Sequence, residues 1–203
     1  MTKEQLIKKV YRCIDEVYPD TDVNSPDVEE FNIPAFLDEA VRWVVNSVPV
    51  SALGDGDDNN FELTIPDGFL RLISLKMKGW KVPVMDALTI DNPRYWQQQN
   101  PALRAGVSRP VVFLDYVGYQ FDPYPRGEGV SEEFPKGEIV GINIFKMDKG
   151  DDGLYSDESY ENYPDKLLDI TAWKTAELIF SMMQDANGMS VAQAHIASIT
   201  PTL

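Results

Sequence analysis

Apolar residues recur at helical spacing in the first 50 residues of the 203-residue chain, and this pattern predicts two helices. The first is expected to begin at Thr2 and Gln5, which have the spacing of a capping box. It is expected to end at Tyr18-Pro19-Asp20, because proline cannot donate the next helical hydrogen bond. The second begins near Asn32 to Pro34 and closes at Pro49. The stripes are Leu6, Val10, Cys13, Ile14 and Val17, then Leu37, Val41, Val44, Val45 and Val48.

The last third of the chain returns to helical spacing. Pro164 fits the first turn of a helix, and an apolar stripe runs from Leu168 through Ala172 and Ile179 to Met183. Asn187-Gly188 is expected to end this helix, since glycine commonly follows a helix C-terminus. Ser190 and Gln193 are then expected to cap a short final helix that runs through Ile199.

The middle of the chain alternates apolar and polar residues, which is typical of strands. Gly79 is expected to turn one strand back on itself as a hairpin, and a short helix is expected over residues 92–100. The predicted strands are Phe61 to Ile65, Phe69 to Lys78, Trp80 to Met85, Val111 to Leu114, Gly118 to Phe121 and Glu138 to Lys146.

This order predicts an α+β fold, with N- and C-terminal helices packed together and a small antiparallel β-rich insertion between them. We expect one domain over residues 1–203, with helical parts at 1–54 and 160–203 and a β-rich part at 55–159. Two domains that separate near residues 55 and 160 are the alternative.

Composition excludes several classes of protein. The chain has 33 Asp and Glu against 18 Lys and Arg, a net charge of −15, which argues against a free-standing binder of nucleic acid or anionic membranes. One cysteine, Cys13, cannot form an internal disulfide, and one histidine, His195, cannot anchor a His/Cys metal cluster. No apolar run approaches a membrane span and the N-terminus has no apolar signal core, so we expect a soluble protein.

The charges are unevenly distributed along the chain. Cys13 to Val41 holds nine carboxylates and Asp151 to Asp165 holds six, and neither segment has a Lys or Arg. Between Arg71 and Arg109, in contrast, seven basic residues meet only Asp86 and Asp91. Acidic and basic patches of this kind fix register when copies or partners associate, although solvated surfaces would show the same pattern.

No motif predicts a catalytic, cofactor or metal site, and we expect a protein that is not an enzyme. The Asp148 to Gly153 segment lacks two ligands of a calcium loop and is expected to be a turn. Cys13 lies on an apolar helix stripe, which indicates a buried thiol. The aromatic residues Tyr116, Tyr119, Phe121 and Tyr124 are expected to pack in the core or an interface.

Five short motifs follow one another in an order that carries a resemblance. The first, Pro66 to Arg71, joins a proline-acid turn to an aromatic residue and an arginine at a strand start. The others are a segment over Ala87 to Trp96, Arg109-Pro110 before a strand, Tyr119 to Pro125 with its Pro-x-Pro end, and the proline-started helix Tyr163 to Leu168. This series resembles the head-to-tail adaptor proteins of short-tailed phages, of the podovirus tail tubular protein A type. The acidic composition, rich in Asn, Asp and Tyr, is similar to that of ring proteins of crAss-like phages.

The resemblance implies a structural virion protein at the head–tail junction, assembled in the cytoplasm of the host bacterium. Its copies would form a ring, expected to be dodecameric, below the portal protein, and the ring would contact the tail or a further ring. DNA would pass through the channel without specific binding, since an acidic wall repels phosphate. The candidate assembly contacts are Arg71, Lys76, Lys78 and Lys81 in the basic segment, and Asp151, Asp152, Asp157 and Glu158 in the acidic one.

Other functions remain open at this point. A head-completion stopper or a tail-side ring protein would have the same order of elements. A small acidic cytoplasmic enzyme or ligand-binding domain would need a preformed apolar pocket. An inhibitor that mimics DNA would use the net charge, although the basic middle of the chain is unfavourable for it.

Overall fold

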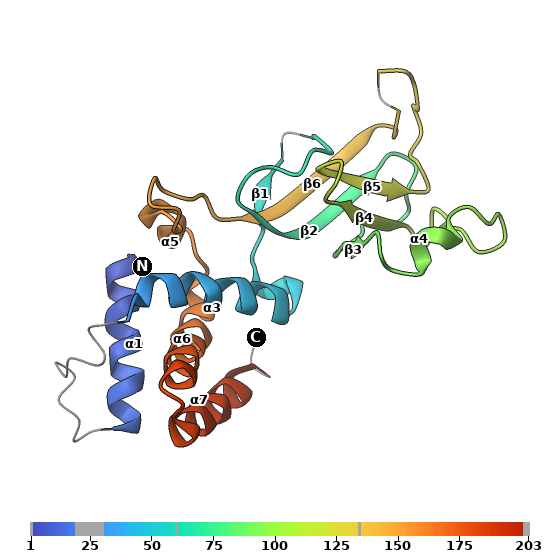
Figure 1. Ribbon diagram of the computed structural model, residues 1–203. Coiled ribbons are helices and arrows are strands. Elements are labelled where there is room, and N and C mark those ends of the chain that lie inside the picture. The colour runs from blue at the N-terminus through green and yellow to red at the C-terminus, as the bar shows by residue number, and fades with distance from the viewer. Residues whose placement is uncertain (1, 19–30, 60, 134, 201–203) are drawn as a thin grey trace. The chain divides into compact units, whose positions relative to one another are not determined.

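The computed structural model describes residues 2–18, 31–59, 61–133 and 135–200, and divides the chain into two compact units (Figure 1). The helical unit combines residues 1–54 with residues 147–203, and the β-rich unit holds residues 55–146. The predicted α+β class is therefore confirmed, with N- and C-terminal helices and small sheets between them. Residues 147–159, which the sequence pattern assigned to the β-rich part, group with the helices.

Among the described residues, four long helices build the helical unit: α1 (Lys3–Val17), α3 (Ile33–Ser47), α6 (Leu168–Met182) and α7 (Ala186–Ile199). The short elements η1 (Val50–Ala52), α5 (Asp157–Glu161) and η2 (Asp165–Leu167) accompany them. Helix α6 is central, since it packs against α1, α3 and α7. Its buried Thr171 and Thr175 donate hydrogen bonds to backbone carbonyls four residues earlier, at 2.7 and 2.8 Å, so that their hydroxyl groups can lie in an apolar core.

The first two helices form as the sequence predicts. Thr2 and Gln5 make the reciprocal bonds of a capping box, and the Asn32 side chain accepts from Ala35 N at the start of α3. Helix α1 ends at the expected place, with Tyr18 as its C-cap. Pro19 and Asp20 lie outside the described residues, as do the predicted acidic positions Asp22, Asp27, Glu29 and Glu30.

The predicted end of the penultimate helix is wrong. Helix α6 ends at Met182, because Gln184 takes a left-handed conformation (φ 58°) and the amides of Gln184 and Asp185 bond back to Ser181 and Phe180, at 3.1 and 2.9 Å. Asp185, rather than Ser190, caps α7 through the amides of Asn187 and Gly188. Gly188 therefore lies in the first turn of α7, where a Cβ atom would lie 2.6 Å from the Phe180 ring.

Two three-stranded sheets form the β-rich unit. The first has the order β1 (Asp57–Asp58), β6 (Ile139–Lys146), β2 (Phe69–Met77) and is antiparallel. The second has the order β3 (Leu88–Thr89), β4 (Val111–Asp115), β5 (Gln120–Tyr124), with β3 parallel to β4 and β5 antiparallel to it. Both sheets contribute to one apolar core, made of Leu72, Leu75, Met77, Trp80, Val112, Leu114, Phe121, Ile142 and Ile144.

Three strand predictions need correction. The segment Phe61 to Ile65 makes only a single bridge, between Thr64 and Gln120. The return strand Trp80 to Met85 is reduced to a bridge in which Val84 and Leu75 exchange backbone hydrogen bonds at 2.8 and 2.9 Å, because Pro83 has no amide hydrogen and the Lys81 amide donates to Val107 O instead. Strand β5 begins two residues later than expected, since Asp115 accepts hydrogen bonds from the amides of Val117 and Gly118 and so shapes the turn before it.

The predicted short helix within residues 92–100 is present as α4 (Arg94–Gln97). It belongs to a segment between β3 and β4 that extends to one end of the β-rich unit (Figure 1). The ring of Tyr95 packs edge-on against Phe113 of β4, with 5.1 Å between ring centroids. This contact anchors α4 to the second sheet.

Candidate functional site

The charge asymmetry of the sequence follows the division into units. The helical unit holds 20 carboxylates and 8 Lys or Arg residues, which gives a net charge of −12. The β-rich unit holds 13 carboxylates and 10 Lys or Arg residues, which gives a net charge of −3. The cations of the β-rich unit are concentrated in residues 71–109. Both units are net negative, so a charge-based contact with the helical unit would have to use this basic segment rather than the β-rich unit as a whole.

Two of the four predicted contact cations are engaged in ion pairs within the β-rich unit. Arg71, with only 13% of its side chain exposed, pairs with Asp86 at 3.0 Å. Lys78 pairs with Glu138 at 2.7 Å, and the hydrogen bond with that carboxylate raises the pKa of Lys78. Both cations are therefore partly neutralised before any partner approaches.

Lys76 and Lys81, the other two predicted contact cations, differ from Arg71 and Lys78. Lys76 lies half-buried on β2, and Lys81 is exposed beyond the turn at Gly79. Neither side chain forms an ion pair with a residue that the structure describes. Lys81 is tied to the segment that carries α4, because its backbone amide donates to Val107 O at 2.9 Å.

The four acidic candidates lie in one segment of the helical unit. Asp151 and Asp152 are exposed in a turn, and the Asp152 carboxylate accepts the amide of Leu154 at 3.0 Å. Asp157 and Glu158 are exposed in the first turn of α5, where negative charge is favourable. The turn over Asp148 to Gly153 is confirmed, and the short helix α5 follows it.

A buried carboxylate holds this acidic segment against the helices. Asp38 of α3 is 5% exposed and accepts two hydrogen bonds of 2.7 Å, from the Tyr160 hydroxyl and from the Tyr155 amide. Lys3 donates to the Tyr155 carbonyl at 2.8 Å, and Arg42 Nε donates to the Tyr155 hydroxyl at 2.9 Å. Asp38 is one of the nine carboxylates between Cys13 and Val41, and no local signal in the sequence marks it as buried.

The tyrosines of this cluster are held neutral. Burial raises the pKa of Tyr160, and the nearby Asp38 charge raises it further. Burial also raises the pKa of Tyr163, whose hydroxyl is 2.8 Å from Thr171 Oγ1. Phenols in this state hydrogen bond and pack, and they do not act as bases near neutral pH.

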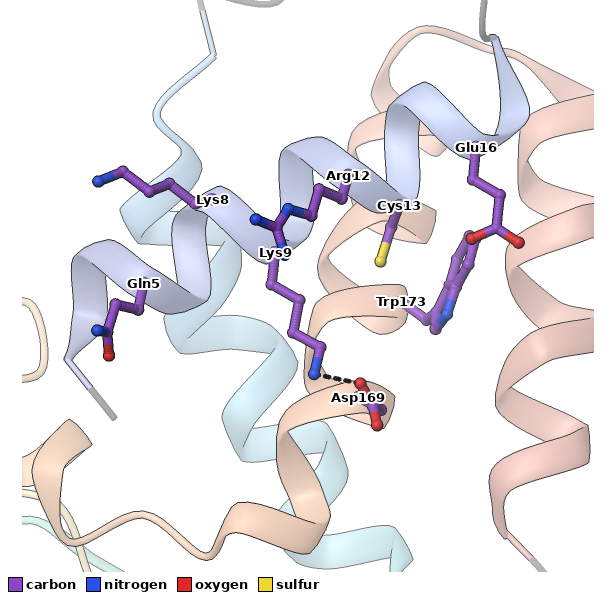
Figure 2. Close-up of a pocket in the computed structure, with 8 residues that line it drawn as sticks. All are labelled: Gln5, Lys8, Lys9, Arg12, Cys13, Glu16, Asp169 and Trp173. Atoms are coloured by element: carbon purple, nitrogen blue, oxygen red, sulfur yellow. Dashed lines mark ion pairs between the residues drawn. The ribbon is translucent and has the colours of Figure 1, made fainter.

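A hollow of about 430 Å³ lies along the seam between α1 and α6 (Figure 2). Lys9 of α1 reaches across it to form an ion pair with Asp169 of α6, and Cys13 points towards Trp173. Burial raises the pKa of the Cys13 thiol to about 12, so the sulfur is protonated and weakly nucleophilic. The imidazole ring of His195, on α7, stacks on the ring of Trp173, with 3.9 Å between the ring centroids. These groups serve packing between helices.

In the described part of the chain, no three His, Cys, Asp or Glu side chains are grouped so that they could hold a metal ion. Among the helices that the structure describes, none is long and apolar enough to cross a membrane.

One candidate surface was missed by the sequence analysis. Residues 92–109, which we call the α4 arm, carry Arg94, Arg104 and Arg109 and no carboxylate. Their apolar residues Trp96, Leu103 and Val107 are 65%, 59% and 43% exposed. Such residues are ordinarily core formers, and periodicity alone cannot tell an exposed short segment from a buried one.

The aromatic residues near β5 divide between core and surface. Phe121 is buried in the sheet core and Tyr124 is half-buried, whereas Tyr116 and Tyr119 are 54% and 68% exposed at the turn between β4 and β5.

Comparison of the chain with protein-family models and with curated proteins finds no match.

Proposed function

We propose that this chain is a structural virion protein of a phage head-to-tail connector. Its copies form a ring, dodecameric in this proposal, that docks to the portal protein at the head–tail junction and receives the tail or a further ring. DNA passes through the ring without specific binding, and the ring is assembled in the cytoplasm of the host bacterium. The chain has no catalytic role in this proposal.

The observation that carries the proposal is the architecture of the chain. Both ends fold together as a helical unit, and one β-rich unit is inserted between them. The order of N-terminal helices, strands and a long C-terminal helix is the one expected of the head-to-tail adaptors that the motifs between Pro66 and Leu168 resemble. The segregated charge adds support, since an acidic helical unit and a basic arm offer complementary surfaces for assembly.

The test is an affinity purification of the tagged chain from cells that produce the virus. The eluate is weighed by light scattering and imaged by negative stain. We expect rings, or rings attached to portal-sized particles and capsids, and the tag alone is the control. Neighbours found in the eluate distinguish a portal-bound adaptor from a stopper or a tail-side ring.

If the eluate holds only a monomer, the purified chain is mixed with the isolated portal protein of the same virus. Co-elution with the portal is then the expected result. Failure to bind the portal would contradict the proposed function.

A further inference from the structure

The α4 arm has the composition of a protein-binding surface. Its three arginines have no carboxylate among residues 92–109 to pair with, and the most exposed of its large hydrophobic side chains is Trp96. Tryptophan and arginine are the residues that most often dominate the free energy of association at interfaces. Exposed apolar groups surrounded by cations indicate a partner that is itself acidic.

The arm is held in one conformation by its own hydrogen bonds. The side chain of Gln98 accepts a hydrogen bond of 2.8 Å from the Ala105 amide, and the side chain of Asn100 accepts one of 3.0 Å from the Ala102 amide. The Arg109 amide donates to Gly106 O at 2.8 Å. A surface that is already ordered loses less conformational entropy when it binds.

The arm also borders a hollow that suits a carboxylate. The hollow is about 510 Å³ in volume, and Arg104 and Arg126 both line it together with Gln98 and Tyr124. Arg104 forms no ion pair among the described residues. Guanidinium groups bind carboxylates with two parallel hydrogen bonds, so an acidic side chain is a fitting occupant.

The same chain carries a surface of matching charge. Residues 151–165 hold six carboxylates and no cation, and those six are exposed. None of the six forms an ion pair with a described residue. The hydrogen bonds of Asp38 to Tyr155 and Tyr160 fix this segment on the helical unit, so it too is ordered before binding.

We infer that the α4 arm binds the acidic segment 151–165 of a second copy of this chain. Trp96 and Leu103 supply apolar contact, and the arginines pair with the carboxylates. This inference rests on the proposed assembly of copies and names the contact between them. The cations of that contact are then Arg94, Arg104 and Arg109. Arg71 and Lys78 are not needed for it, because they already form ion pairs within the chain.

DNA is a weaker candidate for the same surface. The β-rich unit as a whole has a net charge of −3 and the chain one of −15, so phosphate would be repelled at long range. A neighbouring acidic protein surface presents far fewer charges and adds apolar contact with Trp96.

The test places a photo-crosslinking amino acid at Leu103 and mixes that protein with isotope-labelled copies of the natural sequence. Crosslinked peptides are identified by mass spectrometry, with the chain alone and with the chain bound to the portal. We expect crosslinks from position 103 to residues 148–165 of the labelled copies. The R104E/R109E variant should reduce the yield on the order of tenfold. Adding D157K/E158K to the labelled copies should restore it.

Two matched variants serve as controls. Lys8→Glu reverses an exposed cation of the helical unit outside the acidic segment, and Tyr116→Ala removes an exposed aromatic ring outside the arm, to be compared with Trp96→Ala within it. The two control variants should leave the crosslinks unchanged. The inference is overturned by crosslinks to other segments, by an absence of crosslinks between copies in both mixtures, or by equal losses in the control variants. It is also overturned if a DNA duplex binds the chain and R104E/R109E abolishes that binding.

These outcomes are separable from failure of the proposed function. A chain that binds the portal but shows no crosslink to residues 148–165 refutes the contact alone. A chain that shows the contact between copies but does not bind the portal refutes the connector role alone.

Discussion

The Asp38 carboxylate and the Tyr160 hydroxyl, 122 residues apart in the sequence, form a buried hydrogen bond of 2.7 Å. With the bond from the Tyr155 amide to the same carboxylate, it ties the acidic segment to α3. A buried carboxylate is stable only when hydrogen bonds replace its lost hydration, so each partner depends on the others.

Replacing Asp38 should therefore destabilise the fold. Asp38→Ala leaves the Tyr155 amide and the Tyr160 hydroxyl without their acceptor, and we expect a loss of roughly 2–4 kcal/mol in the free energy of unfolding. Urea denaturation measures it. Glu39→Ala, at the exposed neighbouring position, is the control and should change stability by less than about 0.5 kcal/mol. Equal effects of the two variants would show that the Asp38 hydrogen bonds add nothing.

Gly188 should tolerate no side chain. A Cβ atom there would lie 2.5 Å from the Asp185 carboxylate and 2.6 Å from the buried Phe180 ring, so α6 and α7 would have to separate. We expect Gly188→Ala to lower the free energy of unfolding by roughly 1–3 kcal/mol. Gly106→Ala, where no atom lies within 4 Å of the added Cβ, is the control. An unchanged urea midpoint for Gly188→Ala would contradict the close packing described here.

The sequence predicts those elements whose signals are local. Helices α1 and α3 have caps and full apolar stripes, and β2 and β6 have long alternating runs. The prediction that Asn187-Gly188 ends the penultimate helix is wrong, because a sequence alone does not distinguish a glycine required for close helix packing from a glycine that ends a helix. The predicted strand Trp80 to Met85 is only a bridge, because Pro83 has no amide hydrogen and the Lys81 amide donates to Val107, a tertiary contact that the sequence does not show.

Candidate contact residues are harder to predict than helices. Charge alone selected Arg71 and Lys78, but their partners Asp86 and Glu138 become visible only when the chain is folded. Conversely, Asp38 belongs to a run of surface acids in the sequence and is buried in the structure. Net charge per segment can be read from a sequence, whereas the pairing of each charge depends on tertiary contacts.

Stability should fall as the pH rises above about 9. The folded state raises the pKa of Cys13 from 9.0 to about 12, and it raises those of Tyr160 and Tyr163 above 10.0. In alkaline solution the unfolded chain releases these protons first and binds fewer than the folded chain, so unfolding becomes more favourable. Below about pH 9 this contribution to stability is fully present.

Urea midpoints measured from about pH 8 to about pH 11 test this expectation. Cys13→Ala should make the decline shallower, since it removes the group that titrates first in the unfolded chain. A midpoint that does not change over this range, or a Cys13→Ala variant with an unchanged slope, would contradict the assigned burial.

Lys78 should be dispensable for assembly, in contrast to the arm arginines. Its ion pair with Glu138 is exposed on both sides, so Lys78→Ala should leave the urea midpoint nearly unchanged. We expect Lys78→Ala, and also the exchange variant Lys78→Glu/Glu138→Lys, to join portal-bound rings as the natural sequence does, whereas Arg104→Glu/Arg109→Glu does not. Light scattering and negative stain of each variant with the portal provide the measurement. If Lys78→Ala and the exchange variant both fail to assemble while remaining folded, Lys78 itself contacts a neighbour, and the basic contact extends from the α4 arm to the end of β2.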